Sequence, residues 1–233
     1  MPSLLLELSG PLQSWGVNSR FVRRETQMLP TKSGIIGLLA AAMGRRRTDP
    51  IEDLVGIRFG VREEQAGKLT RDFHTAVDWR TGKSLPLSQR YYVSDAKYLA
   101  VVEGDQALVE GLHNAILSPV FPLYLGRRSC PPSGRIVLGI VDDSVENVLE
   151  TADWRASDWY RKNQPQQVNL LWSRDARPDE RHDESVRDAP VSFDPRHRQY
   201  GLRDVRHGWT QVSNPEGRHS PVHDEFLLLG GEG

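Results

Sequence analysis

The order of apolar patterns along residues 3–141 constrains the fold of this chain more than any other feature. Short, mostly apolar runs predict strands, and apolar residues spaced three and four positions apart predict amphipathic helices. Strands are expected at residues 4–8, 57–61, 98–102 and 135–141, and helices over the apolar stripes at residues 35–43 and 108–116. The order is therefore strand, helix, strand, strand, helix, strand.

This order is the split βαβ arrangement of a ferredoxin-like α+β domain, which we expect over residues 1–141. A four-stranded sheet with two helices on one face is also the frame of RNA-recognition modules, although a fold alone does not fix a function. Thr31 or Ser33 can cap the first helix, and Gly44 can end it.

The second and third expected strands are separated by residues 62–97, whereas a hairpin connection needs only two to five residues. The aromatic residues of this insert argue against disorder. We therefore expect a protruding hairpin with a basic, aromatic surface and a turn at Gly82 and Lys83. Beyond it, residues 142–233 are expected to form either a C-terminal extension or a small subdomain, with a mobile polar loop at about residues 173–190.

The charges are divided unevenly along the chain. Residues 1–135 carry 18 Lys and Arg against 13 Asp and Glu, and residues 136–233 carry 12 against 18, although the whole chain has a net charge of −1. The basic half is therefore the better candidate for binding a polyanion. The sequence shows no apolar segment long enough to span a membrane and no signal peptide, and Cys130 is its one cysteine, so we expect a cytoplasmic protein.

Two stretches near the N-terminus are candidates for nucleic-acid contacts. "GPLQSWG" follows the first strand and offers the Trp15 ring as a stacking face for a base, or alternatively as a core side chain. "PTKSG" places Thr31, Lys32 and Ser33 at a helix N-terminus, which suits a phosphate group. Its spacing does not match the Walker P-loop, so nucleotide hydrolysis is not expected.

The stretch "FPLYLGRRSCPPSG", residues 121–134, carries two adjacent arginines on a loop rich in Pro and Gly. Proline fixes φ and glycine permits tight turns, so this loop can hold Arg127 and Arg128 in one orientation. A planar guanidinium suits phosphate or carboxylate groups. The alternative is a solvated surface loop.

The insert alternates cations with aromatic rings, a pattern that holds single-stranded nucleic acid. A second hypothesis is a metal-independent ribonuclease, in which His74 would move protons beside Tyr91 while Lys83 or Lys97 would stabilise a phosphorane. His219 and His223 flank Pro221 and read as loop, so no metal site is expected. No cofactor is expected either.

Four stretches, "LSGPLQSWG", "PTKSGIIGLLAAAMG", "RDFHT" and "YLGRRSCPP", in this order and spacing, resemble the CasD family. This is the CRISPR RNA-binding subunit of the type I-E Cascade complex, in the RAMP superfamily of ferredoxin-like RNA binders. The likeness covers roughly residues 3–140, and weakly "DAPVSFDPRHRQYGLRDV" near the end.

The resemblance implies a non-catalytic subunit that caps the 5′ handle of the CRISPR RNA. It implies contacts with the backbone, large and small subunits of Cascade, and with target DNA through the complex. The insert would be the family's thumb, with His74 as a thumb residue. Together with the sequence patterns, it gives these candidate RNA-binding residues: Gln13, Trp15, Arg20, Thr31, Lys32, Ser33, Arg71, His74, Arg90, Tyr91, Tyr92, Arg127, Arg128 and Ser129.

Overall fold

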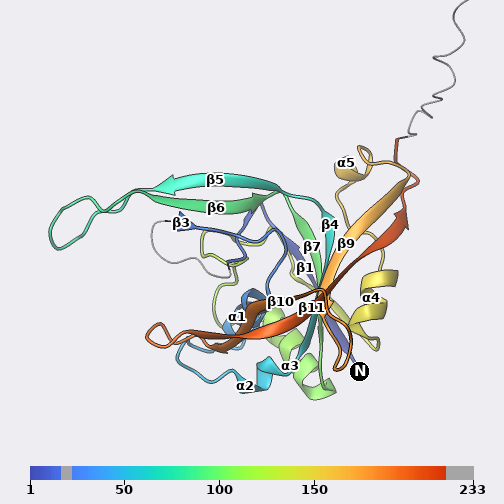
Figure 1. The fold of residues 1–233 in the computed structure, drawn as a ribbon, viewed down its shortest axis with the longest axis horizontal. Coiled ribbons are helices and arrows are strands. Elements are labelled where there is room, and N and C mark those ends of the chain that lie inside the picture. The colour runs from blue at the N-terminus through green and yellow to red at the C-terminus, as the bar shows by residue number, and fades with distance from the viewer. Residues whose placement is uncertain (17–22, 219–233) are drawn as a thin grey trace, which may run out of the picture.

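The computed structural model describes residues 1–16 and 23–218. Its centre is a seven-stranded sheet in the order β10-β11-β9-β4-β7-β1-β8 (Figure 1). The strands are β1 (Ser3–Ser9), β4 (Arg58–Gln65), β7 (Lys97–Glu103), β8 (Val137–Val141), β9 (Gln167–Asp175), β10 (Glu184–Ser192) and β11 (Gln199–Ser213). Three shorter helices accompany it: α2 (Glu52–Val55), α4 (Val145–Thr151) and α5 (Asp158–Arg161).

The six elements expected between residues 3 and 141 are all present, as β1, α1 (Lys32–Ala42), β4, β7, α3 (Gln106–Leu117) and β8. Strand β1 lies between β7 and β8 and pairs antiparallel with both, and β7 pairs antiparallel with β4. The Thr31 hydroxyl accepts a hydrogen bond from the Gly34 N–H and caps α1, as the sequence suggests. Gly44 follows the helix with a φ of 79°.

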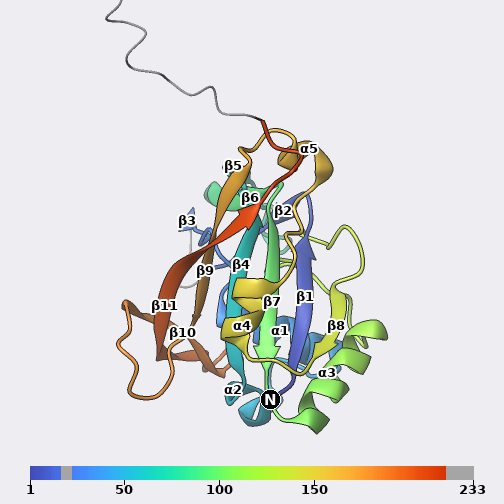
Figure 2. The same cartoon turned by 90° about the vertical axis from the view of Figure 1, so that its right-hand side faces the viewer.

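The two faces of the sheet are covered by different helices. Successive side chains of a strand point to opposite faces. Leu4, Leu6 and Leu8 therefore pack into the larger core with α1 and α3, whereas Leu99 and Val101 pack against α4. Figure 2 shows α4 lying across one face of the sheet, with α1 behind it. The sheet is thus buried on both sides at its centre.

The C-terminal half extends the same sheet beyond β4, because β9 pairs with β4 and β11 pairs with both β9 and β10. The expectation of a mobile loop at residues 173–190 is wrong for most of that range, which lies in β9 and β10. Two aspartates there are buried and paired: the Asp175 carboxylate accepts from Lys32 Nζ at 2.9 Å, and the Asp188 carboxylate accepts from Arg203 Nε at 2.7 Å. The polar residues of this segment therefore include members of buried ion pairs, while those at 177–187 are mostly exposed.

A long hairpin, formed by β5 (Lys68–His74) and β6 (Ser88–Ser94), projects from the sheet (Figure 1). Its turn closes where Asp78 N–H donates to the Lys83 carbonyl, and Gly82 has a φ of 67°, as the sequence suggests. Residues 62–65 of the expected insert instead belong to β4. Two short strands pair with β6: β2 (Leu12–Gln13) pairs with Val93 and Ser94 at the base of the hairpin, and β3 (Arg23–Arg24) pairs with Gln89 and Arg90 nearer its tip.

Glu146 at the start of α4 joins this helix to the sheet. Its carboxylate pairs with the guanidinium groups of Arg58, Arg174 and Arg177. Burial alone would raise the pKa of Glu146, but hydrogen bonds from Arg58 and Arg177 outweigh burial and lower that pKa to about 2. The carboxylate consequently favours the folded state whenever it is ionised.

A carboxyl group whose pKa is lower in the folded state than in the unfolded state stabilises the fold. This stabilisation is complete above the unfolded-state pKa and is lost as the pH falls through the folded-state pKa. We therefore expect Glu146→Gln to lower the free energy of unfolding at pH 7. The same substitution is expected to flatten the loss of stability between about pH 4.5 and pH 2. Urea unfolding across this pH range checks both effects, and superimposed stability curves for the variant and the unsubstituted chain would contradict them.

Candidate nucleic-acid interface

A groove of about 800 Å³ lies on the open side of α1. Small residues of the helix form its floor, namely Gly34, Gly37, Ala40 and Ala41. One wall is the loop at residues 121–131, and the other is the turn between β10 and β11. Three segments that are distant in the sequence therefore meet around one helix.

The loop at residues 121–131 is held rigidly against the core. Val120 N–H donates to the Ala42 carbonyl at 3.0 Å, and Ser14 N–H donates to the Leu125 carbonyl at 3.0 Å. Gly126 has a φ of 88°, and a Cβ built there would lie 1.7 Å from the Ser14 carbonyl oxygen. Only glycine fits this close approach. The expectation of a stiff loop agrees with these contacts.

The opposite wall brings aromatic rings and a cation to the groove. Phe193 lies over α1, since a Cβ built on Gly37 would meet its ring at 3.8 Å. Arg198 and Tyr200 line the same wall. Phe121 and Tyr124 face the groove from the first wall, so rings are available on both sides.

Four exposed arginines surround the groove: Arg46, Arg47, Arg128 and Arg198. Within residues 1–16 and 23–218, none of these side chains forms an ion pair or a hydrogen bond. Arg45, by contrast, is committed to a bidentate pair with Asp53, which raises the Arg45 pKa. Unpaired guanidiniums on three separate segments, with aromatic rings between them, suit the phosphates and bases of a single strand.

Two candidates predicted from the sequence are buried instead. The Trp15 ring is fully buried, and its Nε1–H donates to Gln13 Oε1 at 3.2 Å. Gln13 is also fully buried, and its amide donates to the Ala96 carbonyl at 2.8 Å. Their side chains pack the core beneath the hairpin, so the prediction that Trp15 stacks on a base and that Gln13 contacts RNA is corrected to a structural role.

The helix N-terminus is also occupied from within the chain. Lys32 is buried: its Nζ donates to Asp175 Oδ2 and to the Ile57 carbonyl, while its main-chain N–H donates to Asp188 Oδ2 at 2.9 Å. The prediction that Lys32 binds phosphate is therefore wrong. Thr31 and Ser33 are buried too, but they border the groove.

The two adjacent arginines have different surroundings. Arg127 Nη1 donates to the Tyr91 carbonyl at 3.2 Å, Nη2 donates to the Glu25 carbonyl at 3.4 Å, and the guanidinium lies 4.9 Å from the centre of the Tyr92 ring. It thus ties the loop to the base of the hairpin. Arg128 is exposed and lines the groove, and Ser129 beside it is exposed. Only the second arginine is placed for a ligand.

Arg127→Ala is expected to loosen the hairpin and to lower the free energy of unfolding by about 1–2 kcal/mol, because it removes two charge-assisted hydrogen bonds and a cation–π contact. Hydrogen exchange of the β6 amides should accelerate. Arg128→Ala is the matched control, since it removes an exposed side chain and should change stability by less than about 0.5 kcal/mol. Equal effects of the two substitutions would contradict this division of roles.

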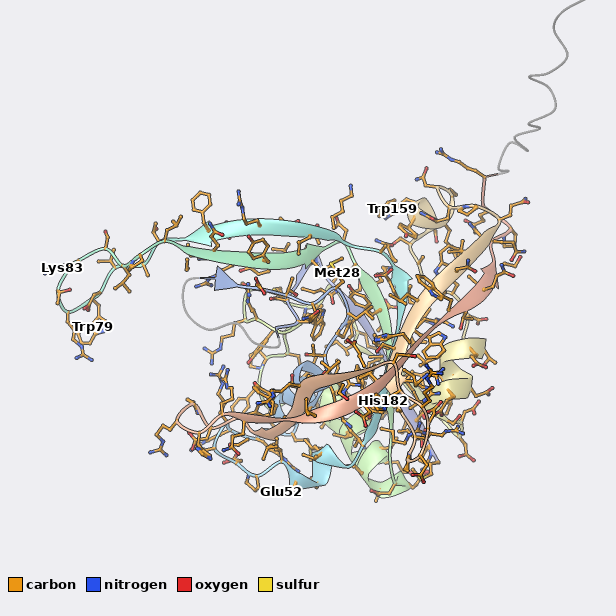
Figure 3. The ribbon with its side chains drawn as sticks, in the orientation of Figure 1. Met28, Glu52, Trp79, Lys83, Trp159 and His182 are labelled. Carbon is orange, nitrogen blue, oxygen red and sulfur yellow. The ribbon has the colours of Figure 1, made fainter. Side chains whose placement is uncertain are left out.

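The hairpin candidates do not converge on one site. Ser88 pairs with His74 and Arg71 pairs with Tyr91, and because Ser88 and Tyr91 are three positions apart, His74 and Tyr91 point to opposite faces. The His74 ring contacts Asp72, and Lys83 lies at the far tip beside Trp79 (Figure 3). The remaining candidates are Arg71, which is exposed, Arg90, which is half-buried, and Tyr92, which is buried. Arg20 lies outside the described residues.

Several groove residues were missed by the sequence interpretation. The triplet Arg45–Arg46–Arg47 directly follows the first helix and was a signal that could have been used. Phe193, Arg198 and Tyr200 could not be recognised because their approach to α1 depends on the extended sheet. Among the described residues, no three His, Cys, Asp or Glu side chains gather as a metal site would require. No helix there is both long and apolar enough to cross a membrane.

This chain is similar to several known proteins. CRISPR system Cascade subunit CasD of Escherichia coli (strain K12) is 35% identical over 156 residues, which is 58% of this chain and 70% of that protein. A structure titled "CRISPR RNA-guided surveillance complex" contains a chain that is 30% identical and matches with a TM-score of 0.75, covering 97% of both chains. Another, "Crystal structure of Cas protein", is 37% identical with a TM-score of 0.70, covering 94% of this chain and 99% of that one.

The model of the family described as CRISPR-associated protein (Cas_Cas5) matches residues 3–206, a range that includes the sheet core, the hairpin and every side chain of the groove. This chain therefore belongs to the CRISPR-associated protein family Cas_Cas5.

Proposed function

We propose that this protein is a non-catalytic subunit of a type I-E Cascade surveillance complex and that it caps the 5′ handle of the CRISPR RNA in the groove beside α1. The observation that carries this proposal is a set of four exposed arginines around one aromatic-lined groove, which have no side-chain partner among the described residues: Arg46, Arg47, Arg128 and Arg198. Phosphate contacts position a strand, and stacked bases add affinity without requiring a particular sequence.

The residues that line the groove suit a single strand with accessible bases. Rings stand on both walls and arginines surround them, so that bases can turn inward while phosphates remain near the cations. Thr31 and Ser33 border the floor of this groove. The 30% identical chain found in an RNA-guided surveillance complex supports the assignment of a CRISPR RNA as the ligand.

The β5–β6 hairpin would serve as the thumb that reaches neighbouring backbone subunits. Its tip exposes apolar side chains, with Trp79 86% and Val77 60% exposed, and Phe73 on β5 is 67% exposed. Exposed apolar side chains gathered on one element are typical of a surface that binds another protein. Exposed Arg71 lies on the same projection, so the hairpin can contact both protein and RNA. Large and small subunits and, through them, target DNA would complete the assembly.

The ribonuclease alternative lacks a converging site, because His74 and Tyr91 lie on opposite faces of the hairpin and Lys83 lies at its tip. A general base must come within hydrogen-bond reach of the proton that it removes. We therefore assign no catalytic role to these residues and treat the hairpin as a binding element.

One assay separates the two functions. Purified protein is incubated in EDTA with labelled CRISPR repeat RNA and with a scrambled RNA of equal length, and samples are resolved on native and denaturing gels. We expect intact RNA and tighter binding of the repeat. A discrete shortened product that disappears with His74→Ala would replace the proposal by the enzyme alternative, and equal, weak binding of both RNAs would contradict handle capping.

A further inference from the structure

A second surface lies on the α1 side of the sheet, beyond the region that α1 covers. Glu63 follows the buried core residue Val61 by two positions on β4, so it points to the same face as Val61. Leu171 precedes Asp175, the partner of Lys32, by four positions on β9 and also points to that face. Trp209 pairs directly with Leu171 across β9 and β11.

These three side chains define what we call the β9–β11 face. Trp209 is 65% exposed and Leu171 is half-buried, and the exposed polar residues Asn169 and Gln211 form the next pair on the same face, two positions along the two strands. Apolar side chains at the centre with polar ones at the margin are typical of protein–protein interfaces. A tryptophan of this exposure is also the residue type that most often dominates binding energy.

No strand among the described residues pairs with the sheet edge beside this face. Strand β10 pairs with β11 only as far as Val205, and residues 208–213 of β11 pair with β9 on one side alone. That segment, "GWTQVS", contains no charged residue and no proline. Natural sheet edges are usually protected by charges, proline or a covering segment.

The charge on the face indicates what covers it. Within the described residues, no side chain or main-chain N–H pairs with the half-buried Glu63 carboxylate, and burial raises its pKa. A carboxylate in this position repels the phosphates of a nucleic acid. If the same faces of two copies of this chain met, the Glu63 carboxylates of the two copies would lie close together and repel each other. A cationic protein side chain complements it.

We propose that the β9–β11 face binds a segment of another protein subunit that presents apolar side chains to Trp209 and Leu171 and a lysine or arginine to Glu63. This inference rests on the proposed function, because the partner is taken to be a subunit of the same complex. It assigns to the extended part of the sheet a role in assembly that is separate from the RNA groove.

The test uses the complex itself. The remaining subunits and CRISPR RNA are co-expressed and purified without this chain, and fluorescently labelled variants of the chain are titrated into that assembly. Trp209→Ser is expected to weaken binding by about 30-fold or more, as for an interface tryptophan. Glu63→Lys should weaken binding by about tenfold or more, since it opposes a cation with a cation. Glu63→Gln should have a smaller effect of the same sign.

Two substitutions serve as matched controls. Trp159→Ser removes a tryptophan that is 59% exposed on α5 (Figure 3), and Glu150→Lys reverses an exposed acid on α4 across the sheet. Both should bind like the unsubstituted chain. If Trp209→Ser and Glu63→Lys also bind normally, the inference is wrong although the proposed function stands. If the unsubstituted chain itself does not join the assembly, the proposed function fails instead.

The affinity of the isolated variants for repeat RNA tests whether a nucleic acid, rather than a protein, binds the β9–β11 face. Trp209→Ser is expected to bind RNA with unchanged affinity, because Trp209 does not line the groove. A loss of RNA affinity in Trp209→Ser that equals its loss of assembly would show that the face binds the RNA strand, and would overturn the proposal of a protein partner.

Discussion

Replacing Arg46, Arg128 and Arg198 together by alanine is expected to weaken binding of CRISPR repeat RNA about 100-fold at roughly 0.1 M salt. The three guanidiniums come from separate segments of the groove and are unpaired among the described residues. Each phosphate contact to a single strand contributes about 0.7 to the slope of log affinity against log salt. Three lost contacts should therefore reduce that slope by about 2, a readout that general unfolding does not produce.

The control for this triple variant is Arg187→Ala, which removes an exposed arginine of β10 that does not line the groove. Its RNA affinity and salt slope should match those of the unsubstituted chain. Circular dichroism should show the same fold for both variants, because all four side chains are exposed. An unchanged salt slope in the triple variant would remove the groove as the RNA site.

Single substitutions of Arg127 and Arg128 are expected to affect RNA binding differently. Arg128→Ala alone should reduce the salt slope by about 0.7, because Arg128 is the member of its pair that faces the groove. Arg127 contacts the Tyr91 carbonyl instead, so its effect should reach the RNA only through the position of the hairpin. The adjacent arginines thus connect the groove to the hairpin through one rigid loop.

The central elements could be predicted because their signals are local. The apolar run of β1 and the apolar stripe of α1 each lie within about a dozen residues. The N-cap of α1 is equally local, because Thr31 accepts its hydrogen bond from Gly34, three positions further along the chain. The long insert between β4 and β7 similarly indicated a projecting hairpin. The spacing of apolar residues and the capping of a helix depend only on residues that are close in the sequence, so both can be identified without knowledge of the tertiary structure.

The site was predicted less well because residues that are distant in the sequence determine whether its side chains are buried or exposed. Lys32 at a helix N-terminus indicates a phosphate site when it is considered alone, yet it meets Asp175 and Asp188, which lie 143 and 156 residues further along the chain. Trp15 likewise becomes a core residue only because α1 and the hairpin base close over it; a Cβ on Gly34 would meet its ring at 2.8 Å. No local pattern contains this information.

The same buried charges lead to the largest expected effect on stability. Asp188 is 1% exposed, and its carboxylate accepts hydrogen bonds from Arg203 Nε and Nη2 and from the Lys32 main-chain N–H. Arg203 Nη1 also donates to Asp175 Oδ1 at 2.7 Å. This network joins β10 and β11, and with them one wall of the groove, to the start of α1.

Asp188→Asn is expected to lower the free energy of unfolding by about 3–5 kcal/mol, because two buried cations, Lys32 and Arg203, would then share the single carboxylate of Asp175. For a chain of this size the melting temperature should fall by roughly 6–20 °C. Asp204→Asn is the matched control: that carboxylate is 53% exposed on β11 and should matter by less than about 0.5 kcal/mol.

Asp188→Asn should also weaken RNA binding below the melting temperature, because the wall that carries Arg198 and Tyr200 would no longer be fixed against α1. Its salt slope, in contrast to that of the triple arginine variant, should remain nearly unchanged, since the same guanidiniums are present. Calorimetry and RNA titration of the same samples check both expectations. A variant that melts like the unsubstituted chain would show that the network does not hold this wall in place.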